Sequence, residues 1–339
     1  QIWHTNEIRT QRPTPVDEAK WGFAVIENSL WTAVPKYLRK LDEDLQAALG
    51  KPLPIDCSPV RFASWMGGDR DGNPNVTHRT TEEVLMLSRW MAADLYMRDV
   101  NQLRTELSMY QCNDELRQQS AAADEPYRYI LGKLIKALGR TKDWIEHQLD
   151  GEAIEPQGVI LQQQQLLEPL MLCHRSLLDC GMQIIAEGLL EDIIRRVACF
   201  GVTLVKLDIR QNADRHTQVL DELSDFYGFG AYSSWTEEER QSFLLKELYS
   251  KRPLIPIDWQ PSAAVEEVLD TCKVIANTDP AALGSYIISM ASQPSDVLAV
   301  ILLLREMGTK HDMRVVPLFE TLADLEHSGD CIDALLAVD

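Results

Sequence analysis

The sequence has few of the features that assign a protein to a class at first sight. No apolar run approaches the roughly 18 residues that a transmembrane helix requires, so a membrane protein is not expected. The seven cysteines lie far apart and form no Cys-x-x-Cys pair, which argues against a disulfide framework and favours a reduced, cytoplasmic protein. No internal repeat of fixed period and no linker rich in Gly or Ser is present either.

Basic residues are also scarce. The chain carries 33 Lys and Arg against 52 Asp and Glu, a formal net charge of -19. A broad nucleic-acid-binding surface needs positive charge along one face, so nucleic acid is not an expected partner. An anionic ligand would need a local positive site within this acidic field. Each arginine at a candidate site is therefore a possible contact for such a ligand.

What the sequence does contain is mostly helical periodicity. Thr14 followed by Pro15 predicts a helix start, and this helix should run to Gly50 with a kink at Pro35. Further helices are expected over residues 125–149 and 159–199, the latter a pair broken near Gly181.

Two capping boxes predict further helix starts. Thr80 with Glu83 should open one long amphipathic helix, and Ser234 with Glu237 should open another that ends near Ser250. The first is followed by apolar residues at steps of three and four, typical of a helix with one buried face: Val84, Leu87, Met91, Leu95, Val100, Leu103 and Leu107.

Four short segments break the helical pattern, and each has the length of a strand. They are residues 61–66, 202–209, 285–290 and 314–319. Each is followed by a polar loop and then a helix, an order that favours parallel βα units. The fold class expected is therefore mostly α with β/α units. The long helical insertions suggest either an open sheet or part of a helix-rich, elaborated barrel of the (β/α)8 type, of which about four strands are found here.

In such folds ligands bind beyond the carboxyl ends of the strands, and residues 67–74 follow the first strand. This Gly- and Asp-rich stretch is either a sharp turn whose Asp and Asn bind local backbone groups, or a loop that lets a ligand approach the main chain. A calcium loop is excluded because its twelfth position is Thr80 rather than Glu. A phosphate-binding P-loop is excluded because no Gly-Lys-Ser/Thr follows.

Charged residues end the second and fourth strands. Asp208 and Arg210 should share one side of the second strand, where Arg210 either binds a phosphate or carboxylate or forms a structural ion pair with Asp208. Leu318 and Glu320 share a face after the fourth strand. Glu320 either holds Mg²⁺ together with a ligand from elsewhere or interacts with the following helix dipole. Ser295, after the third strand, is expected to be a helix N-cap.

Five stretches in one order closely resemble the phosphoenolpyruvate carboxylase family. The most specific is FASWMGGDRDGNPNVT at residues 62–77, and the others are residues 2–22, LDIRQ at 207–211, ISMASQPSDVLAV at 288–300, and VVPLFETLADL at 315–325. The resemblance implies a β/α barrel surrounded by helices, so that residues 1–339 would form a single partial catalytic domain. It also implies the reaction of phosphoenolpyruvate with bicarbonate, which gives oxaloacetate and phosphate and requires Mg²⁺ or Mn²⁺.

Position by position, the resemblance assigns roles to four residues. Glu320 looks like one of two carboxylate ligands of the metal ion, and Arg210 looks like a catalytic contact to the substrate phosphate. Trp65 and Leu318 are similar to residues that line an apolar pocket around the substrate methylene. Members of the family are commonly homo-tetramers.

Other parts of the family pattern are missing from the sequence. The His-Pro-Thr-Glu stretch with its catalytic histidine and the second metal carboxylate are expected outside these 339 residues. We therefore expect an internal fragment that is inactive in isolation. The alternative is a non-catalytic helical scaffold or regulatory module derived from the same family.

Overall fold

The computed structural model describes residues 13–338, most of which are helical. These residues form two compact units. Unit 1 combines the described residues up to Trp21 with Trp65–Val84 and the chain from Leu207 onward, and unit 2 combines Gly22–Ser64 with Leu85–Lys206. The prediction of a single catalytic domain stays a prediction. Within the described part, no helix is both long and apolar enough to cross a membrane.

The first helical segment begins and ends as predicted. Thr14 precedes α1 (Pro15–Val25), which passes through a π-helical turn, η2 (Ile26–Leu30), into α2 (Trp31–Leu49). Gly50 follows α2 in a left-handed conformation, with a φ of 67°, which a residue without a Cβ adopts at no steric cost. Residues 2–12 of the first family-like stretch lie outside the described residues.

The kink predicted at Pro35 stays a prediction. The helix α2 continues through Pro35, and the π-helical turn η2 precedes it. Proline has no N–H, so the carbonyl of Trp31, four residues earlier, has no helical donor. Arg196 Nε donates to that carbonyl at 2.7 Å. The same guanidinium and the Trp31 indole both donate to Asp99 Oδ2, at 2.9 Å each. Tertiary hydrogen bonds thus offset what the proline removes.

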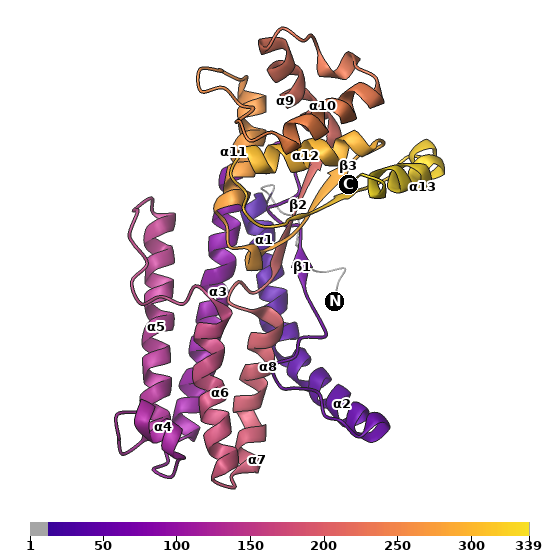
Figure 1. Ribbon diagram of the computed structural model, residues 1–339. Coiled ribbons are helices and arrows are strands. Elements are labelled where there is room, and N and C mark those ends of the chain that lie inside the picture. The colour runs from indigo at the N-terminus through magenta and orange to yellow at the C-terminus, as the bar shows by residue number, and fades with distance from the viewer. Residues whose placement is uncertain (1–12, 339) are drawn as a thin grey trace, which may run out of the picture. The chain divides into compact units, whose positions relative to one another are not determined.

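Unit 2 is a helical bundle in which α5, α6 and α8 run side by side (Figure 1). Gly181, with a φ of 73°, separates α6 from the helices that follow it, which confirms the predicted break. The helices of this part of the chain are α4 (Asp114–Gln119), α5 (Pro126–Leu149), α6 (Gln163–Asp179), α7 (Gln183–Ile185), η3 (Ala186–Leu190) and α8 (Glu191–Phe200).

The long helix α3 (His78–Glu106) starts earlier than predicted. Thr80 lies inside the helix, and its N–H donates to the hydroxyl of Thr77 at 3.3 Å. The capping box predicted at Thr80 and Glu83 is therefore wrong, because Thr77 receives the bond instead. The buried face of the helix is confirmed at Val84, Leu95, Val100 and Leu103.

Two further caps in unit 1 also differ from prediction. Thr236 with Glu239, rather than Ser234 with Glu237, caps α10 (Glu237–Tyr249). Gln293 with Asp296, rather than Ser295, caps the helix after β3. The other helices of the unit are α9 (Ala213–Phe226), η4 (Tyr232–Ser234), α11 (Ala263–Asn277), η5 (Pro280–Ala282), α12 (Pro294–Glu306) and α13 (Leu322–Leu336).

The physical reason for both shifts is a tertiary bond between the two predicted caps. The Ser295 hydroxyl donates to Glu237 Oε2 at 2.6 Å, and the Ser295 N–H donates to Oε1 at 3.0 Å. The carboxylate of Glu237 therefore accepts hydrogen bonds from α12 instead of capping its own helix. Ser295 is the second residue of α12 and so lies inside the helix. Neighbouring residues with the same local chemistry take over the caps.

The strands form one sheet in the order β1-β2-β3-β4, and both β2–β3 and β3–β4 are parallel. Their bounds are Ala63–Ser64, Lys206–Asn212, Leu283–Ser289 and Arg314–Pro317. The predicted parallel βα units are thus confirmed, although β1 is only two residues long. The described residues contain these four strands, so a closed barrel stays a prediction.

A buried histidine lies between the sheet and its covering helix. His216 on α9 is only 1% exposed, and its Nε2 lies 2.7 Å from the hydroxyl of Tyr286 on β3. Its Nδ1 is buried with no hydrogen-bond partner among the described residues. Burial lowers the pKa of His216 to about 3, because the charged imidazolium would lose its solvation.

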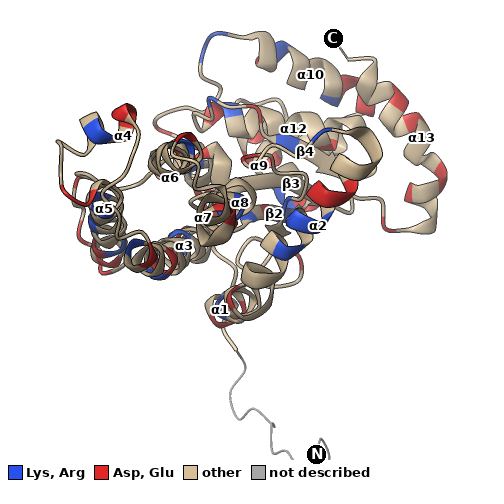
Figure 2. Cartoon of the chain, turned by 90° about the horizontal axis from the view of Figure 1, so that it is seen from below, with Lys and Arg blue, Asp and Glu red and all other residues tan. Residues whose placement is uncertain are grey.

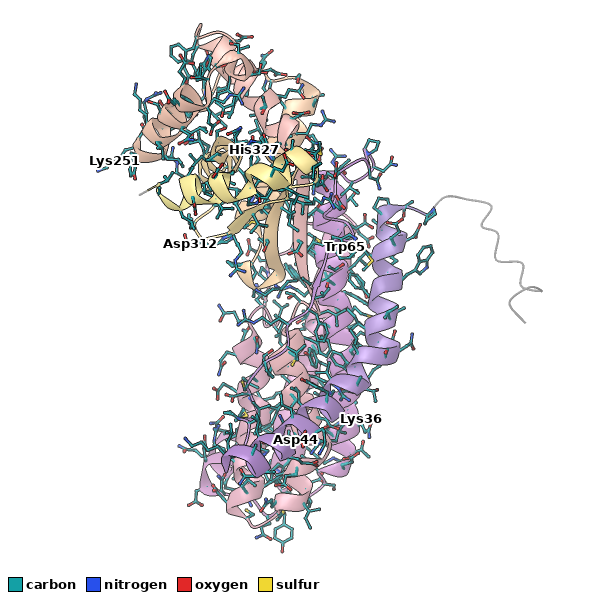
Figure 3. All side chains as sticks on the ribbon, turned by 90° about the vertical axis from the view of Figure 1, so that its right-hand side faces the viewer. Lys36, Asp44, Trp65, Lys251, Asp312 and His327 are labelled. Atoms are coloured by element: carbon teal, nitrogen blue, oxygen red, sulfur yellow. The ribbon has the colours of Figure 1, made fainter. Side chains whose placement is uncertain are left out.

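We expect His216 to make the stability of the protein depend on pH. Its folded-state pKa lies below the unfolded value near 6.5, so between the two the unfolded chain binds the extra proton. The free energy of unfolding should therefore fall as the pH drops below about 6.5, by up to about 1.4 kcal/mol per pH unit. Urea unfolding at several pH values should show a smaller slope for His216→Gln. The same change at exposed His327 (Figure 3) should leave the slope unaltered. Equal slopes for all three proteins would contradict the assignment.

Candidate functional site

The alternation of β2 places Arg210 at the candidate site. Leu207, Ile209 and Gln211 point into the interior and are buried, whereas Asp208 and Arg210 lie on the other side and are partly exposed. This arrangement confirms the predicted shared face. In the register of the sheet, Arg210 is aligned with Ile287 of β3.

The Arg210 guanidinium lies among carboxylates from two other segments. Its Nη2 donates to Asp71 Oδ2 and to Glu320 Oε1, each at 2.9 Å. Its Nε lies 3.9 Å from Asp69 Oδ1. All four side chains keep between 27% and 31% of their surface exposed, so the cluster is half-buried. The structure thus brings together the two predicted site residues, Arg210 and Glu320.

The cluster retains capacity for ligands of both signs. Both hydrogen bonds of Arg210 leave from Nη2, and its Nη1 has no hydrogen-bond partner among the described residues. Donors of this planar group therefore remain for a phosphate or carboxylate. The three carboxylates also outnumber the one guanidinium, and this excess of negative charge favours a nearby cation.

The loop over residues 67–74 is built directly onto β2. The Arg210 N–H donates to the Gly68 carbonyl, and the Arg70 N–H donates to the Arg210 carbonyl, both at 2.9 Å. This approach leaves no room for a side chain, because a Cβ on Gly68 would lie 2.0 Å from the Asp208 carbonyl oxygen. The glycine therefore permits the loop to present Asp71 to Arg210.

Most polar side chains of the loop have local partners. Asp69 accepts from the Asp71 N–H at 3.0 Å, and Asn73 accepts from the Asn75 N–H at 3.1 Å. Arg70 is buried and donates to the Gly68 carbonyl and to the Thr81 hydroxyl. The interpretation of the stretch as a turn with local capping is thus confirmed. Asp71 is the exception, and its role as partner of Arg210 was missed.

The alternative structural pair between Asp208 and Arg210 is wrong. Asp208 Oδ1 instead accepts from the Ser285 N–H of β3 at 2.7 Å. Gly284 makes room for this carboxylate, because a Cβ there would lie 2.0 Å from Asp208 Oδ1. Asp208 therefore links β2 to β3 through a hydrogen bond, whereas the Arg210 side chain binds Asp71 and Glu320.

Glu320 lies in the turn between β4 and α13. The helix cap itself comes from Thr321 and Asp324, so Glu320 is not needed for it. One Glu320 oxygen binds Arg210, and a carboxylate can still offer its second oxygen to a hard cation such as Mg²⁺. Among the described residues no group of three acidic, His or Cys side chains could hold a metal ion. The chain thus fits one ligand of a divalent-cation site, not the whole set.

Trp65 and Leu318 occupy less defined positions. The Trp65 carbonyl accepts from the N–H groups of Gly68 and Asp69 at the start of the loop. Trp65 as a whole is 65% exposed (labelled in Figure 3), so the described residues do not enclose it. The Leu318 N–H donates to the Ile288 carbonyl at 2.9 Å, which prolongs the pairing of β4 with β3. The predicted apolar pocket around these two residues stays a prediction.

The fold and the site define a helix-rich α/β protein with an ionic cluster at the ends of parallel strands. A family model described as phosphoenolpyruvate carboxylase matches residues 1–339. The chain belongs to the phosphoenolpyruvate carboxylase family.

Curated relatives of the same description support this result. The phosphoenolpyruvate carboxylases of Marinobacter nauticus and Hahella chejuensis are each 58% identical to it, over 100% and 99% of the chain. That of Klebsiella pneumoniae is 56% identical over the whole chain. The chain spans 38% to 39% of the length of these relatives.

Proposed function

We propose that the chain forms part of the catalytic domain of an enzyme that joins bicarbonate to phosphoenolpyruvate, giving oxaloacetate and phosphate. The observation that carries this proposal is the 2.9 Å contact between Arg210 and Glu320. The two residues come from different βα units, and both lie where parallel strands place a ligand site. Relatives that are 58% identical carry the name of this enzyme.

In this proposal Arg210 binds the substrate phosphate through its unoccupied donors, and Asp71 holds the guanidinium in place. Glu320 supplies one carboxylate ligand to Mg²⁺ or Mn²⁺, and a second comes from outside the described residues. The cation, when bound, stabilises negative charge on the substrate oxygen. Trp65 and Leu318 border the substrate methylene. We also propose a cytoplasmic homo-tetramer for the whole enzyme.

A complete (β/α)8 barrel is part of the same proposal. Two features of unit 1 support it. The strand β4 is the last in the described sheet, and α13 exposes Leu322, Leu325 and Leu336 by 75%, 56% and 78%. An open sheet edge and a helix with exposed leucines are usually covered by further structure.

The test is to replace the matching segment of the Marinobacter nauticus enzyme with this chain. We expect the chimera to form oxaloacetate in a coupled assay, and to require phosphoenolpyruvate, bicarbonate and a divalent cation. The isolated chain should show no activity, because it carries one proposed metal ligand and one proposed phosphate contact. The unaltered relative is the positive control. A folded but inactive chimera would favour the scaffold role. Activity of the isolated chain would contradict the proposal that essential site residues lie outside it.

A further inference from the structure

A hollow of about 550 Å³ lies among α4, α5 and α6, entirely within unit 2. Its volume falls within the range of small-molecule sites, roughly 300 to 1,000 Å³. None of its lining residues belongs to the ionic cluster around Arg210. It is therefore a separate feature of the molecule, and its chemistry does not depend on the function proposed above.

The rim of this hollow is positively charged, whereas the chain as a whole is negatively charged. Four cations line it, three from α5 and one from α6: Lys133, Lys136, Arg140 and Arg175. Lys133, Lys136 and Arg140 are three and four residues apart, so they share one face of α5; Figure 2 colours such basic positions blue. The two carboxylates of the lining, Glu115 and Glu168, leave two positive charges in excess. In a chain with a net charge of -19, this is a local positive site.

The four cations differ in how many contacts they already make with other protein groups. Arg175 donates to Glu115 Oε1 at 2.8 Å, and Arg140 Nε donates to the Gly158 carbonyl at 2.9 Å. The latter bond fixes the Arg140 side chain and uses only one of its five N–H donors. Lys133 lies over the Tyr129 ring, 4.4 Å from its centre. Within residues 13–338, Lys136 has neither an ion-pair nor a hydrogen-bond partner. The two lysines thus keep their ammonium donors for a ligand.

The floor of the hollow is apolar. Ile130, Leu134 and Leu172 line it and are 3% to 7% exposed. Pro169, also in the lining, interrupts the hydrogen bonding of α6, because it has no N–H to donate to the Gln165 carbonyl. A bare inorganic ion would use the rim and leave this floor uncovered.

We propose that the hollow binds a small organic anion, a phosphate ester or a carboxylate attached to an apolar group. The lysines and Arg140 contact the charged end, and the leucines and Ile130 contact the apolar body. This combination of a few convergent polar groups with an apolar lining is typical of ligand sites. A site of this kind, lined by none of the residues of the ionic cluster, suits an effector or a second substrate-sized metabolite.

Calorimetric titration of the chain tests this proposal with phenyl phosphate and benzoate as probes. Inorganic phosphate carries the charge without the ring, and phenol carries the ring without the charge. We expect saturable binding of at least one aromatic anion, about tenfold tighter than either comparison compound, because rim and floor act together. The tighter of the two anions identifies the head group. Binding no tighter than that of the comparison compounds would overturn the proposal.

The matched variants locate the site. Lys133→Gln with Lys136→Gln should weaken binding of the tighter probe about tenfold, and resonances of α5 and α6 should no longer shift in NMR titrations. Lys36→Gln with Lys51→Gln removes the same charge from exposed positions elsewhere in unit 2 (Lys36 is labelled in Figure 3). These control changes should alter the affinity less than twofold. If both double variants lost affinity equally, or if the Lys133/Lys136 variant lost none, the hollow would not be the binding site.

Discussion

Replacement of Arg210 by Gln in the chimeric enzyme is expected to lower kcat/KM for phosphoenolpyruvate by about a thousandfold. The guanidinium is the cationic group of the cluster, and it would neutralise charge that develops on the transferring phosphoryl group. Its removal also leaves Asp71 and Glu320 without the partner that each contacts at 2.9 Å, so the site would repel an anionic substrate. Steady-state kinetics at saturating bicarbonate and Mg²⁺ measure the effect.

Two further variants distinguish a specific loss of charge or geometry at Arg210 from a nonspecific effect of removing an arginine. Arg210→Lys keeps the charge but loses the planar fork, so an intermediate loss is expected. Arg215→Gln removes an exposed arginine from the helix that follows the same strand, and it should retain nearly full activity. Circular dichroism checks that each variant is folded. Activity of Arg210→Gln within threefold of the unsubstituted chimera would remove Arg210 from the proposed site.

Replacement of Gly68 by Ala should reduce the stability of the chain by about 3 kcal/mol. The added Cβ would lie 2.0 Å from the carbonyl oxygen of Asp208, which belongs to the backbone of β2 and has no flexible side chain to move aside. Either the loop or the strand must shift, and both hydrogen bonds between Gly68, Arg70 and Arg210 would be lost or stretched. Urea unfolding followed by circular dichroism gives the change.

Gly329 supplies the matched control for this substitution. It lies in α13, in the same unit, and a Cβ there would meet no atom within 4 Å. Alanine is the better helix former, so Gly329→Ala should raise stability by roughly 0.5 to 1 kcal/mol. The same substitution is thus expected to destabilise the chain at Gly68 and to stabilise it slightly at Gly329. A Gly68→Ala protein as stable as the unsubstituted chain would show that the loop does not pack on β2 as described.

Local sequence chemistry was sufficient to predict many elements of this fold, but not α4 and α11, and not every helix start. The caps at Thr80, Ser234 and Ser295 were each displaced by two or three residues. In every case several Ser, Thr, Gln or acidic residues stood close together, and each could serve as a cap. The bond between Ser295 and Glu237, 58 residues apart, decided two of them, and no local pattern encodes such a contact.

The candidate site shows the same limit. Alternation along β2 was sufficient to place Asp208 and Arg210 on one face. The identity of their partners depends on residues 77, 110 and 139 positions away. Asp71 could not be recognised as a partner of Arg210, because the pattern around it is fully explained by a local turn. The resemblance to a family predicted that Arg210 and Glu320 belong to one site. The structure places the two side chains in contact.

The most direct test of this account is the structure of the chimera with Mn²⁺ and a non-reactive phosphonate analogue of phosphoenolpyruvate. We expect the Glu320 carboxylate to coordinate Mn²⁺, located by its anomalous scattering. We also expect Arg210 to donate to the phosphonate while Asp71 keeps its contact with the guanidinium. A structure in which Arg210 and Glu320 remain paired with each other, while metal and analogue bind elsewhere, would contradict it.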